Sequence, residues 1–447
     1  MSIRLIESLG ATEPLAEVFS DLSVLQAMLD FEVALARAEA QLRIIPQSAA
    51  RAIARAARAE GYDGAALARG TLRAGTPGIP LVNALRKKVQ QEDAFAADYV
   101  HWGATSQDVA DTALVLLLRK SAAIFNAELA RMEKALRVLS AKHKNTVMLG
   151  RTLLQPAPPV TLGLKTAGWL ASVRRGRARL NRAISEAQVL QFGGASGTLS
   201  ALEGRGIQLS ELIARQLGLR VPDAPWHAHR DRLAEVVCAC AILTGSLGKM
   251  ARDISLLMQH EVGEVAEPGL GGRGGSSTMP HKRNPIASAL TLAAANRVPG
   301  LAAAFLSQMV QEHERAAGGW QAEWPTVASV IQSTGVALAS MAEVAEGLSV
   351  DPRRMRQNIQ STHGAPFSEK VALRLTAHMG REKAHEMLRS WSDPTRRNKR
   401  TLSEALAEVP EARRYLGRKY DQPDEYLGSA QDFIRRLSRN SRPRRRK

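Results

Sequence analysis

Apolar residues recur at helical spacing along most of the chain. Between residues 20 and 44, Leu25, Leu29, Val33 and Ala36 follow one another at steps of three or four, which predicts an amphipathic helix. The clearest pattern lies in residues 231–262, where steps of four and three alternate over Val236, Cys240, Leu243, Leu247, Met250, Ile254 and Leu257. This heptad seam, with no proline in about 32 residues, predicts a helix about 48 Å long at 1.5 Å per residue.

Other long segments are also poor in proline and compatible with helix, namely residues 113–146, 160–190, 286–312 and 326–348. Strand signals are few, so the sequence predicts an all-α protein with a central bundle of long helices. The pattern breaks near residues 103–111 and 349–366. We therefore expect three helical domains: an N-terminal domain (1–112), a central long-helix bundle (113–350) and a C-terminal domain with a basic tail (351–447). If such a seam is present on more helices than one chain can cover, helices from other subunits must cover the rest. We therefore also expect an oligomer.

A glycine-rich segment, GGSSTMPHKRNP at residues 274–285, interrupts the helical pattern. Glycines at 271, 272, 274 and 275 free the backbone, which predicts a mobile loop before Ser276. Asn284 and Pro285 have the pattern of an N-cap and a first helical residue. That arrangement would put Lys282 and Asn284 at the positive end of a helix, where an anion can bind. A mobile hydroxyl beside a cationic site is typical of a lid that closes over a carboxylate substrate.

Two further segments carry polar residues that admit both a functional and a structural interpretation. In HWGATSQDVADT (101–112), His101, Thr105 and Ser106 crowd at a predicted helix start. They are candidate substrate contacts, although Thr105 or Ser106 can equally be a plain N-cap. In GRTLLQPAPP (150–159), a candidate site formed by Arg151, Thr152 and Gln155 can equally be a helix terminus with a solvated arginine.

Two more segments are similarly open. The glycines of FGGASGTL (192–199) permit close approach of the backbone to a ligand, or simply form a tight turn. In QEHERAAGGWQAEW (311–324), Arg315 can clamp a carboxylate with two parallel hydrogen bonds, or be a charge on a helix surface.

Composition narrows the class of protein. Hydrophobic residues make up 45% of the 447 residues but aromatic residues only 4%, so alanine and leucine fill most of the core, as close helix packing requires. We find no run of about 20 consecutive apolar residues and expect no membrane span. The N-terminus lacks the features of a secretory signal. The only cysteines, Cys238 and Cys240, cannot build a disulfide framework, and a reducing cytoplasm fits them.

The formal net charge is +18, partly because of a basic terminus that we expect to lack fixed structure: Arg435, Arg436, Arg439, Arg442, Arg444, Arg445, Arg446 and Lys447. Such a tail can bind nucleic acid, but no aromatic residues are interleaved for base stacking. We therefore interpret it as a solvated terminus and expect no nucleic-acid partner. The remaining positive charge can steer a polyanionic small substrate toward its site.

A histidine pair raises the question of a metal. His227 and His229, with Asp231, have a spacing that metal ligands can adopt, but no cysteine or further histidine completes the set. We interpret them as polar surface residues and expect neither a metal nor an organic cofactor.

Taken together and in this order, the polar segments resemble the three separated motifs of the fumarase/aspartase superfamily, which meet in one active site. GSSTMPHKRNP resembles the superfamily signature, and HWGATSQD and GRT resemble the other two motifs, with the resemblance running from about residue 20 to 390. The resemblance implies a fumarase-like all-α fold and a cytoplasmic homotetramer whose active sites each draw residues from three subunits. Within the superfamily, the segments are most similar to the 3-carboxy-cis,cis-muconate cycloisomerases of aromatic (protocatechuate, β-ketoadipate) catabolism, and adenylosuccinate lyase is the nearest competitor.

One departure from the superfamily pattern helps to choose between these activities. Many members carry a histidine directly after the threonine of the second motif, where it handles the proton of an amine, water or amide, but this chain has Leu153. Leucine cannot transfer a proton. A carboxylate of the substrate itself, with a pKa of about 4, is already ionised near neutral pH and needs no general base. Leu153 therefore favours lactonisation of a carboxymuconate.

The resemblance also implies roles for individual residues. Ser276 would transfer the proton, and Lys282 with Asn284 would stabilise the charge that builds on the intermediate. The remaining carboxylates of a small tricarboxylate substrate would be bound or oriented by the other candidates: His101, Thr105, Ser106, Arg151, Thr152, Gln155, Gln259 and Arg315. His101 can equally cap a helix or support another residue.

Two alternatives stay open at this point. An amine-releasing, adenylosuccinate-lyase-like enzyme would produce fumarate, and Leu153 argues against it. A non-catalytic relative would use the basic tail, and the intact Ser276, Lys282 and Asn284 argue against that.

Overall fold

The computed structural model describes residues 5–269, 274–275, 278–279, 282–392, 401–416 and 420–438. The chain divides into two compact units, each assembled from three stretches. The first unit takes Met1–Leu129, Arg175–Gly248 and Leu290–Ser340, and the second takes Ala130–Arg174, Lys249–Ala289 and Met341–Lys447. The long helices contribute residues to both units, so the boundaries of the units differ from those expected at residues 112 and 350. The division into three domains stays a prediction.

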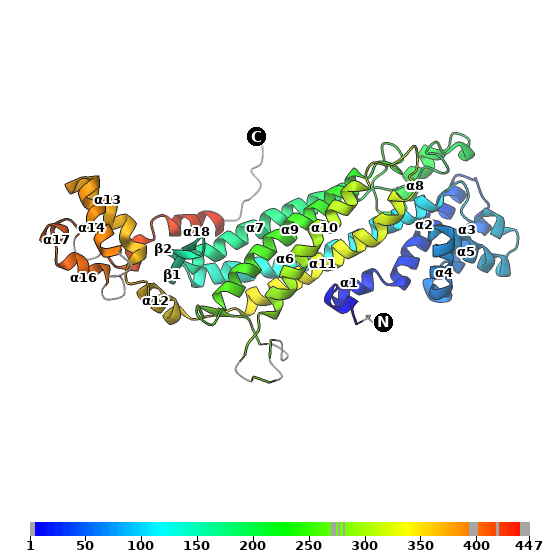
Figure 1. Cartoon of the computed structure of the whole chain (residues 1–447). Coiled ribbons are helices and arrows are strands. Elements are labelled where there is room, and N and C mark those ends of the chain that lie inside the picture. Colours follow the sequence, from blue (N-terminus) through cyan, green and yellow to red (C-terminus); the bar gives the residue numbers. More distant parts are fainter. Residues whose placement is uncertain are drawn as a thin grey trace. The chain divides into compact units, whose positions relative to one another are not determined.

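In the first unit, shorter helices gather around one central helix, α2 (Figure 1). The side chain of Ser20 caps α2 by accepting a hydrogen bond from the Ser23 N–H at 3.1 Å. One face of α2 buries Met28, Leu29 and Leu35 against its neighbours, chiefly α3 and α8. The helices of this group are α1 (Glu13–Val18), α2 (Asp21–Gln41), α3 (Gln47–Ala56), α4 (Gly64–Ala74), α5 (Gly78–Glu92) and α8 (Gly206–Leu217). The helix predicted between residues 20 and 44 is confirmed.

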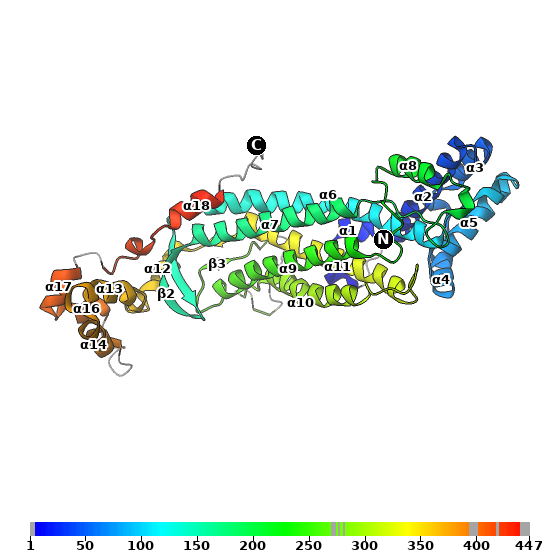
Figure 2. The ribbon, with the colours of Figure 1, turned by 90° about the horizontal axis from the view of Figure 1, so that it is seen from above.

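The long helices are α6 (Ser106–Lys142), α7 (Leu162–Ala187), α9 (Asp231–Leu257), α10 (Ile286–Ser307) and α11 (Gly319–Gly347). Their stretches within the first unit run alongside one another (Figure 2). Small residues allow the close approach: a methyl group on Gly176 of α7 would lie 2.7 Å from Leu243 of α9, and one on Gly248 of α9 would lie 2.6 Å from Ala295 of α10. The predicted bundle of long helices, and with it the all-α class, is confirmed.

The heptad seam of α9 is buried within the chain itself, because none of its seven residues is more than 5% exposed. The chain's own helices therefore cover this seam, and the expected oligomer stays a prediction. The helix also ends at Leu257, earlier than residue 262, because the chain turns at Gly263, whose φ is 59° and whose N–H donates to the Gln259 carbonyl at 2.7 Å.

The second unit contains a β-hairpin that the sequence did not predict. Its strands β1 (Val147–Thr152) and β2 (Gln155–Thr161) pair antiparallel, with Thr152 opposite Gln155. The two residues of the tip, Leu153 and Leu154, have φ values of 50° and 64°. Such turns usually use Asn-Gly or Asp-Gly, so a Leu-Leu pair gives no turn signal.

The C-terminal part of the second unit, from α12 onward, is mainly helical (gold to red in Figure 1). A hydrophobic cluster that includes Phe367, Val371, Leu375 and Trp391 packs its helices together with β1. The further elements are β3 (Val265–Ala266) paired with β4 (Ser349–Val350), α12 (Pro352–Gln360), α13 (Ser368–Met379), α14 (Arg381–Ser392), α16 (Leu402–Ala407), α17 (Pro410–Leu416) and α18 (Ala430–Ser438). Arg435 and Arg436 lie in α18, so the expectation of a structureless tail is wrong for these two. The residues from 439 onward lie outside the described residues.

Three helices, α9, α10 and α11, are long and apolar enough to cross a membrane, judged by length and composition alone. Many alanines raise the mean hydropathy of these helices without an unbroken run of about 20 apolar residues, and the expectation that no helix spans a membrane stays a prediction. In α9 and α11, 61% and 72% of the apolar window is buried inside the protein, but in α10 only 28% is buried. Much of the apolar surface of α10 is therefore left uncovered by the described part of the chain.

Candidate active site

The candidate residues fall into two groups, one in each unit. The first group, here called the loop cluster, combines the HWGATSQD and FGGASG segments with Arg315. Thr105 directly precedes α6, and its hydroxyl oxygen accepts a hydrogen bond from Arg315 Nη1 at 3.0 Å. Ser106 is the first residue of α6 and lies against Gly78 of α5, where an added methyl group would be 2.7 Å from the Ser106 Cβ. Residues far apart in sequence therefore meet here; that the three superfamily motifs meet in one active site stays a prediction.

Asp108 organises the loop cluster. Its carboxylate is fully buried, and both oxygens accept two hydrogen bonds each. Oδ1 accepts from the Gly193 N–H at 3.0 Å and from His227 Nε2 at 2.7 Å, and Oδ2 accepts from the N–H groups of Thr105 at 3.0 Å and Gly194 at 2.9 Å. One carboxylate thus joins three segments, those of Thr105, the glycine loop and His227, and the glycine loop is bound to it rather than free. His227 is only 3% exposed, so the expectation of a polar surface residue is wrong for it: Asp108 gives its ring a buried partner. Asp231 and His229 are exposed, as expected.

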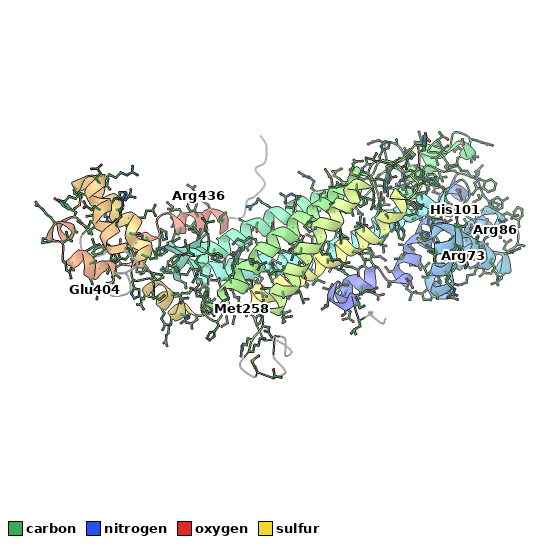
Figure 3. The ribbon with its side chains drawn as sticks, viewed as in Figure 1. Arg73, Arg86, His101, Met258, Glu404 and Arg436 are labelled. Carbon is green, nitrogen blue, oxygen red and sulfur yellow. The ribbon has the colours of Figure 1, made fainter. Side chains whose placement is uncertain are left out.

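His101 lies in the first unit (Figure 3) and pairs with a buried carboxylate. Its Nδ1 is 2.6 Å from Oε1 of Glu32, a residue of α2. Burial alone lowers the pKa of His101, but the charge of Glu32, the hydrogen bond to it and the charge of Asp108 together outweigh burial and raise the pKa. His101 is therefore biased toward the imidazolium form, which suits the binding of a carboxylate.

Arg315 lies between α10 and α11 rather than on a helix surface, so the helix-surface interpretation is wrong. Its guanidinium donates to the carbonyls of Gly194 at 3.3 Å and Ala195 at 3.0 Å, besides Thr105. These acceptors are all neutral, so its described hydrogen bonds leave its charge without a carboxylate partner. Its Nε atom is buried and finds no hydrogen-bond partner among the described residues. Arg315 is therefore well suited to take an anion.

Behind the loop cluster lies a buried ion network that connects α6, α9 and α11. Arg230, which precedes α9, donates to Asp111 at 2.7 and 2.9 Å and to Glu323 at 2.5, 2.9 and 3.0 Å. Burial raises the pKa of Asp111, but the charge of Arg230 and hydrogen bonds from Arg230, Gln191 and Trp320 outweigh it, so the pKa is lowered. For Glu323, burial outweighs Arg230 and the pKa is raised. The network fixes the segments of α6, α9 and α11 that support the loop cluster.

The second group, in the second unit, centres on Arg151 of β1. Its guanidinium donates to Oε1 of the buried Glu264 at 2.6 Å and to Oε2 at 3.1 Å. Asn358 of α12 donates to the same carboxylate at 2.7 Å. Arg151 is thus already paired with a carboxylate of the protein. The interpretation as a solvated arginine at a helix end is wrong, because Arg151 lies in a strand.

Three other candidates of this unit, Thr152, Gln155 and Gln259, are exposed. Thr152 and Gln155 flank the tip of the hairpin, and Gln259 lies in the turn after α9. The backbone carbonyl of Gln259 accepts hydrogen bonds from Val262 at 2.9 Å and Gly263 at 2.7 Å, which closes that turn.

The signature segment is described only in part, and Ser276 lies outside the described residues. The N–H of Lys282 donates to the Met279 carbonyl at 3.0 Å, and the N–H of Asn284 donates to the Gly274 carbonyl at 2.8 Å. Lys282 is exposed and Asn284 half-buried.

The start of α10 differs from the prediction. The helix begins at Ile286, so Asn284 is not its N-cap. Instead, Glu267 accepts hydrogen bonds from the N–H groups of Ala287 at 3.0 Å and Ser288 at 2.8 Å, and from the Ser288 hydroxyl at 2.6 Å. The anion site predicted at this helix end is therefore occupied by a carboxylate of the protein itself.

Sequence reasoning missed several residues that support the site, including Glu32, Glu264, Glu267 and Arg230. Glu32 occurs among apolar residues of a helix and carries no local signal of a partner. Each of these residues acts through a contact with a distant segment, and a single sequence does not display such contacts. Among the described residues, no group of three or more His, Cys, Asp and Glu side chains is arranged to hold a metal ion.

Known proteins and protein families are similar to this chain over most of its length. The family model described as "Lyase" matches residues 7–300, and the model described as "Adenylosuccinate lyase C-terminus" matches residues 364–437. The chain is 48% identical to the 3-carboxy-cis,cis-muconate cycloisomerase of Bradyrhizobium diazoefficiens over an alignment of 421 residues, and this alignment covers 93% of each protein. It is 45% identical to the enzyme of that name from Pseudomonas aeruginosa, over an alignment that covers 97% of this chain and 95% of that protein.

A solved structure extends the likeness to three dimensions. The crystal structure of 3-carboxy-cis,cis-muconate lactonizing enzyme from Pseudomonas putida matches with a TM-score of 0.92 and 43% identity, over 98% of each chain. The fumarase-like, all-α fold and the superfamily resemblance are thereby confirmed. The chain belongs to the lyase family of the fumarase/aspartase superfamily.

Proposed function

We propose that the protein is a cycloisomerase that interconverts 3-carboxy-cis,cis-muconate and 4-carboxymuconolactone, a step of aromatic (protocatechuate, β-ketoadipate) catabolism. Relatives that carry this name are 45–48% identical over nearly the whole chain. In the forward direction a substrate carboxylate oxygen adds to the conjugated double bond and closes the lactone ring. The electron pair moves onto a neighbouring carboxylate, and the resulting enolate-like carbon then takes up a proton.

The observation that carries the proposal is the tip of the hairpin. The side chains there are Leu153, which is 96% exposed, and Leu154, which is 79% exposed. The tip therefore offers no group that accepts a proton from an amine or from water. Addition of a carboxylate needs no such group, because the nucleophile is ionised already.

The remaining steps assign roles to the candidate residues. Ser276 gives its proton to the enolate-like carbon, and Lys282 with Asn284 stabilises the negative charge that builds before that transfer. The other carboxylates of the substrate are bound by the loop cluster and the second group. Arg315 is the stronger candidate for a direct ion pair, because its acceptors are neutral, whereas Glu264 already compensates Arg151. Each turnover consumes one proton, which Ser276 gives to carbon and regains from solvent, and no electrons are gained or lost, so no redox partner is needed.

Running the reaction in D2O tests this proposal. Intramolecular addition followed by protonation from an exchangeable group should convert carboxymuconate into lactone with one deuterium on the former vinylic carbon, detected by NMR. A lactone without deuterium would exclude proton transfer through an exchangeable hydroxyl such as that of Ser276. Absence of lactone would exclude the proposed substrate.

We also propose that the protein is a cytoplasmic homotetramer with shared active sites. The argument rests on α10, whose exposed face presents, at steps of four and three, the small residues Ala289, Ala293, Gly300, Ala303 and Ser307, with the larger Asn296 among them. Side chains this small let another helix approach closely, and a second copy of the chain would cover the apolar surface that α10 leaves exposed. The two cysteines are free thiols, as in a reducing compartment.

Mixing two inactive variants tests the sharing of sites. Arg315→Ala removes a residue of the first unit, and Lys282→Ala removes one of the second. If each active site takes Arg315 from one subunit and Lys282 from another, a mixed oligomer contains some sites in which both residues are intact. Dissociating the two variants and reassembling them together should then restore part of the activity. Sedimentation should give the mass of four chains. A monomer, or mixtures that stay inactive, would contradict the proposal.

The match of residues 364–437 to the C-terminal model of adenylosuccinate lyase favours one alternative, an amine-releasing lyase that produces fumarate. Leu153 argues against it on chemical grounds. Assaying adenylosuccinate beside carboxymuconate separates the two.

A further inference from the structure

Glu32 is a buried carboxylate outside the recognised motifs that pairs with one of the candidate substrate contacts, His101. It sits on α2, and its side chain is 1% exposed. Oε1 is 2.6 Å from His101 Nδ1, and Oε2 is buried with no hydrogen-bond partner among the described residues. Removing a carboxylate from water is costly, so its hydrogen bond to His101 is its main compensation.

The geometry determines which ring atom carries a proton. An ionised carboxylate only accepts hydrogen bonds, so Nδ1 of His101 must be the donor. Asp108, the other carboxylate facing His101, already accepts hydrogen bonds from Thr105, His227 and the two glycines of the loop. The Nε2 atom of His101 is then the ring position left for a ligand.

The other charged or titratable groups near this pair do not compete for His101. Burial, and secondarily the charge of Glu32, raises the pKa of Glu39 to about 9 and that of Tyr62 to about 12, so both are neutral near pH 7. Arg315 is turned toward Thr105 and the glycine loop. Glu32 and Asp108 are therefore the anions that favour a cationic ring.

The backbone at His101 also needs support. Its φ is 62°, in the left-handed region that residues other than glycine rarely adopt. Such conformations persist only where surrounding contacts hold them. The hydrogen bond to Glu32 provides such a contact from a different helix.

We propose that Glu32 is a positioning residue: its carboxylate holds the His101 ring as an imidazolium whose Nε2–H donates a hydrogen bond to a carboxylate of the substrate. The inference rests on the proposed function, because the substrate carboxylate is what Nε2 would bind. Glu32, a residue of α2, thus supports a substrate contact of the loop cluster.

Glu32→Gln tests this role, with Glu39→Gln as the matched control. Both residues are buried on α2, seven positions apart, but Glu39 has no hydrogen-bond partner among the described residues. At about pH 8, Glu32→Gln should raise KM for 3-carboxymuconate about 10- to 100-fold, because one charge-assisted hydrogen bond typically contributes about that much to binding. The change in kcat should be much smaller. Near pH 6 the gap should narrow, because His101 becomes protonated without Glu32. Glu39→Gln should keep the wild-type pH profile of kcat/KM.

A second measurement does not depend on turnover. In protein labelled with ¹³C at histidine Cε1, the His101 signal, identified by its loss in His101→Gln, should titrate above pH 6.5 in the wild type and at a lower pH in Glu32→Gln. If Glu32→Gln does not fold, the wild-type titration decides alone, and a midpoint at or below 6.5 overturns the proposal.

A folded Glu32→Gln protein with the wild-type KM and pH profile would also overturn it. Should the wild type leave carboxymuconate untouched while Glu32→Gln still lowers the His101 titration, the proposed function fails and the pairing of Glu32 with His101 is supported.

Discussion

Removing Arg230 should destabilise the first unit strongly, and more so as the pH rises. In Arg230→Met, Asp111 and Glu323 lose the guanidinium that lies between them, together with hydrogen bonds of 2.5 to 3.0 Å. All three side chains are completely buried, so water does not replace the lost partner. Removing one member of a buried ion pair costs about 3–5 kcal/mol, and we expect the free energy of unfolding to fall by about that amount near pH 8.

The pH dependence follows from the two carboxylates. In the native protein the pKa of Asp111 is below its ordinary value of 3.8, so its stabilising effect is present above that value and is lost as the pH falls below it. In the variant, burial without Arg230 raises the pKa of Asp111, and it raises further the pKa of Glu323, which burial already holds above 4.5 in the native protein, so the variant loses stability as the pH rises above about 4. The deficit relative to wild type should therefore be small near pH 4.5 and large near pH 8.

Urea unfolding followed by tryptophan fluorescence, at one fixed protein concentration and at both pH values, measures this difference. Arg232→Met is the matched control, because Arg232 is 4.0 Å from the exposed Asp223 and should change stability by less than about 1 kcal/mol. A loss in Arg230→Met no greater than in the control, or one equal at both pH values, would refute the reasoning.

Three other changes have specific expected outcomes. Glu39→Gln should stabilise the protein near pH 8 but not near pH 4, measured by thermal unfolding: the raised pKa, about 9, means that the native state loses stability as the pH rises from about 4.5 toward 9, and glutamine cannot ionise. An equal effect at both pH values would show that ionisation is not the cause. Ser276→Ala and Lys282→Ala should each lower kcat about 100- to 1,000-fold while circular dichroism stays unchanged, and full activity in either variant would remove that residue from the mechanism. Gly78→Ala places a methyl group 2.7 Å from the Ser106 Cβ and should cost about 1–3 kcal/mol and reduce kcat/KM, whereas Gly168→Ala, with nothing within 4 Å, should be neutral or stabilising; similar behaviour of the two would argue against tight packing at Ser106.

Periodicity was enough to predict the long helices. The α9 seam and the apolar face of α2 repeat at helical spacing, and burial follows that spacing directly. The resemblance also named Thr105 and Arg315, 210 positions apart, as contacts of one substrate; the structure joins them by a hydrogen bond, and their binding of substrate stays a prediction.

The rest depends on contacts between distant segments. The hairpin escaped prediction because Leu153 and Leu154 occupy turn positions that tolerate them only at a cost in backbone strain. The cap of α10 comes from Glu267, some 20 residues upstream, rather than from the adjacent Asn284. The burial of His227 depends on Asp108, whose role as a shared acceptor appears only once the three segments are folded together.

The central claim is that this protein closes a lactone with a substrate carboxylate as the nucleophile. The most direct test is an ultraviolet assay in which the purified protein is given 3-carboxy-cis,cis-muconate and, separately, adenylosuccinate. We predict loss of the carboxymuconate absorbance and no change with adenylosuccinate. Turnover of adenylosuccinate alone, with release of fumarate, would contradict the account.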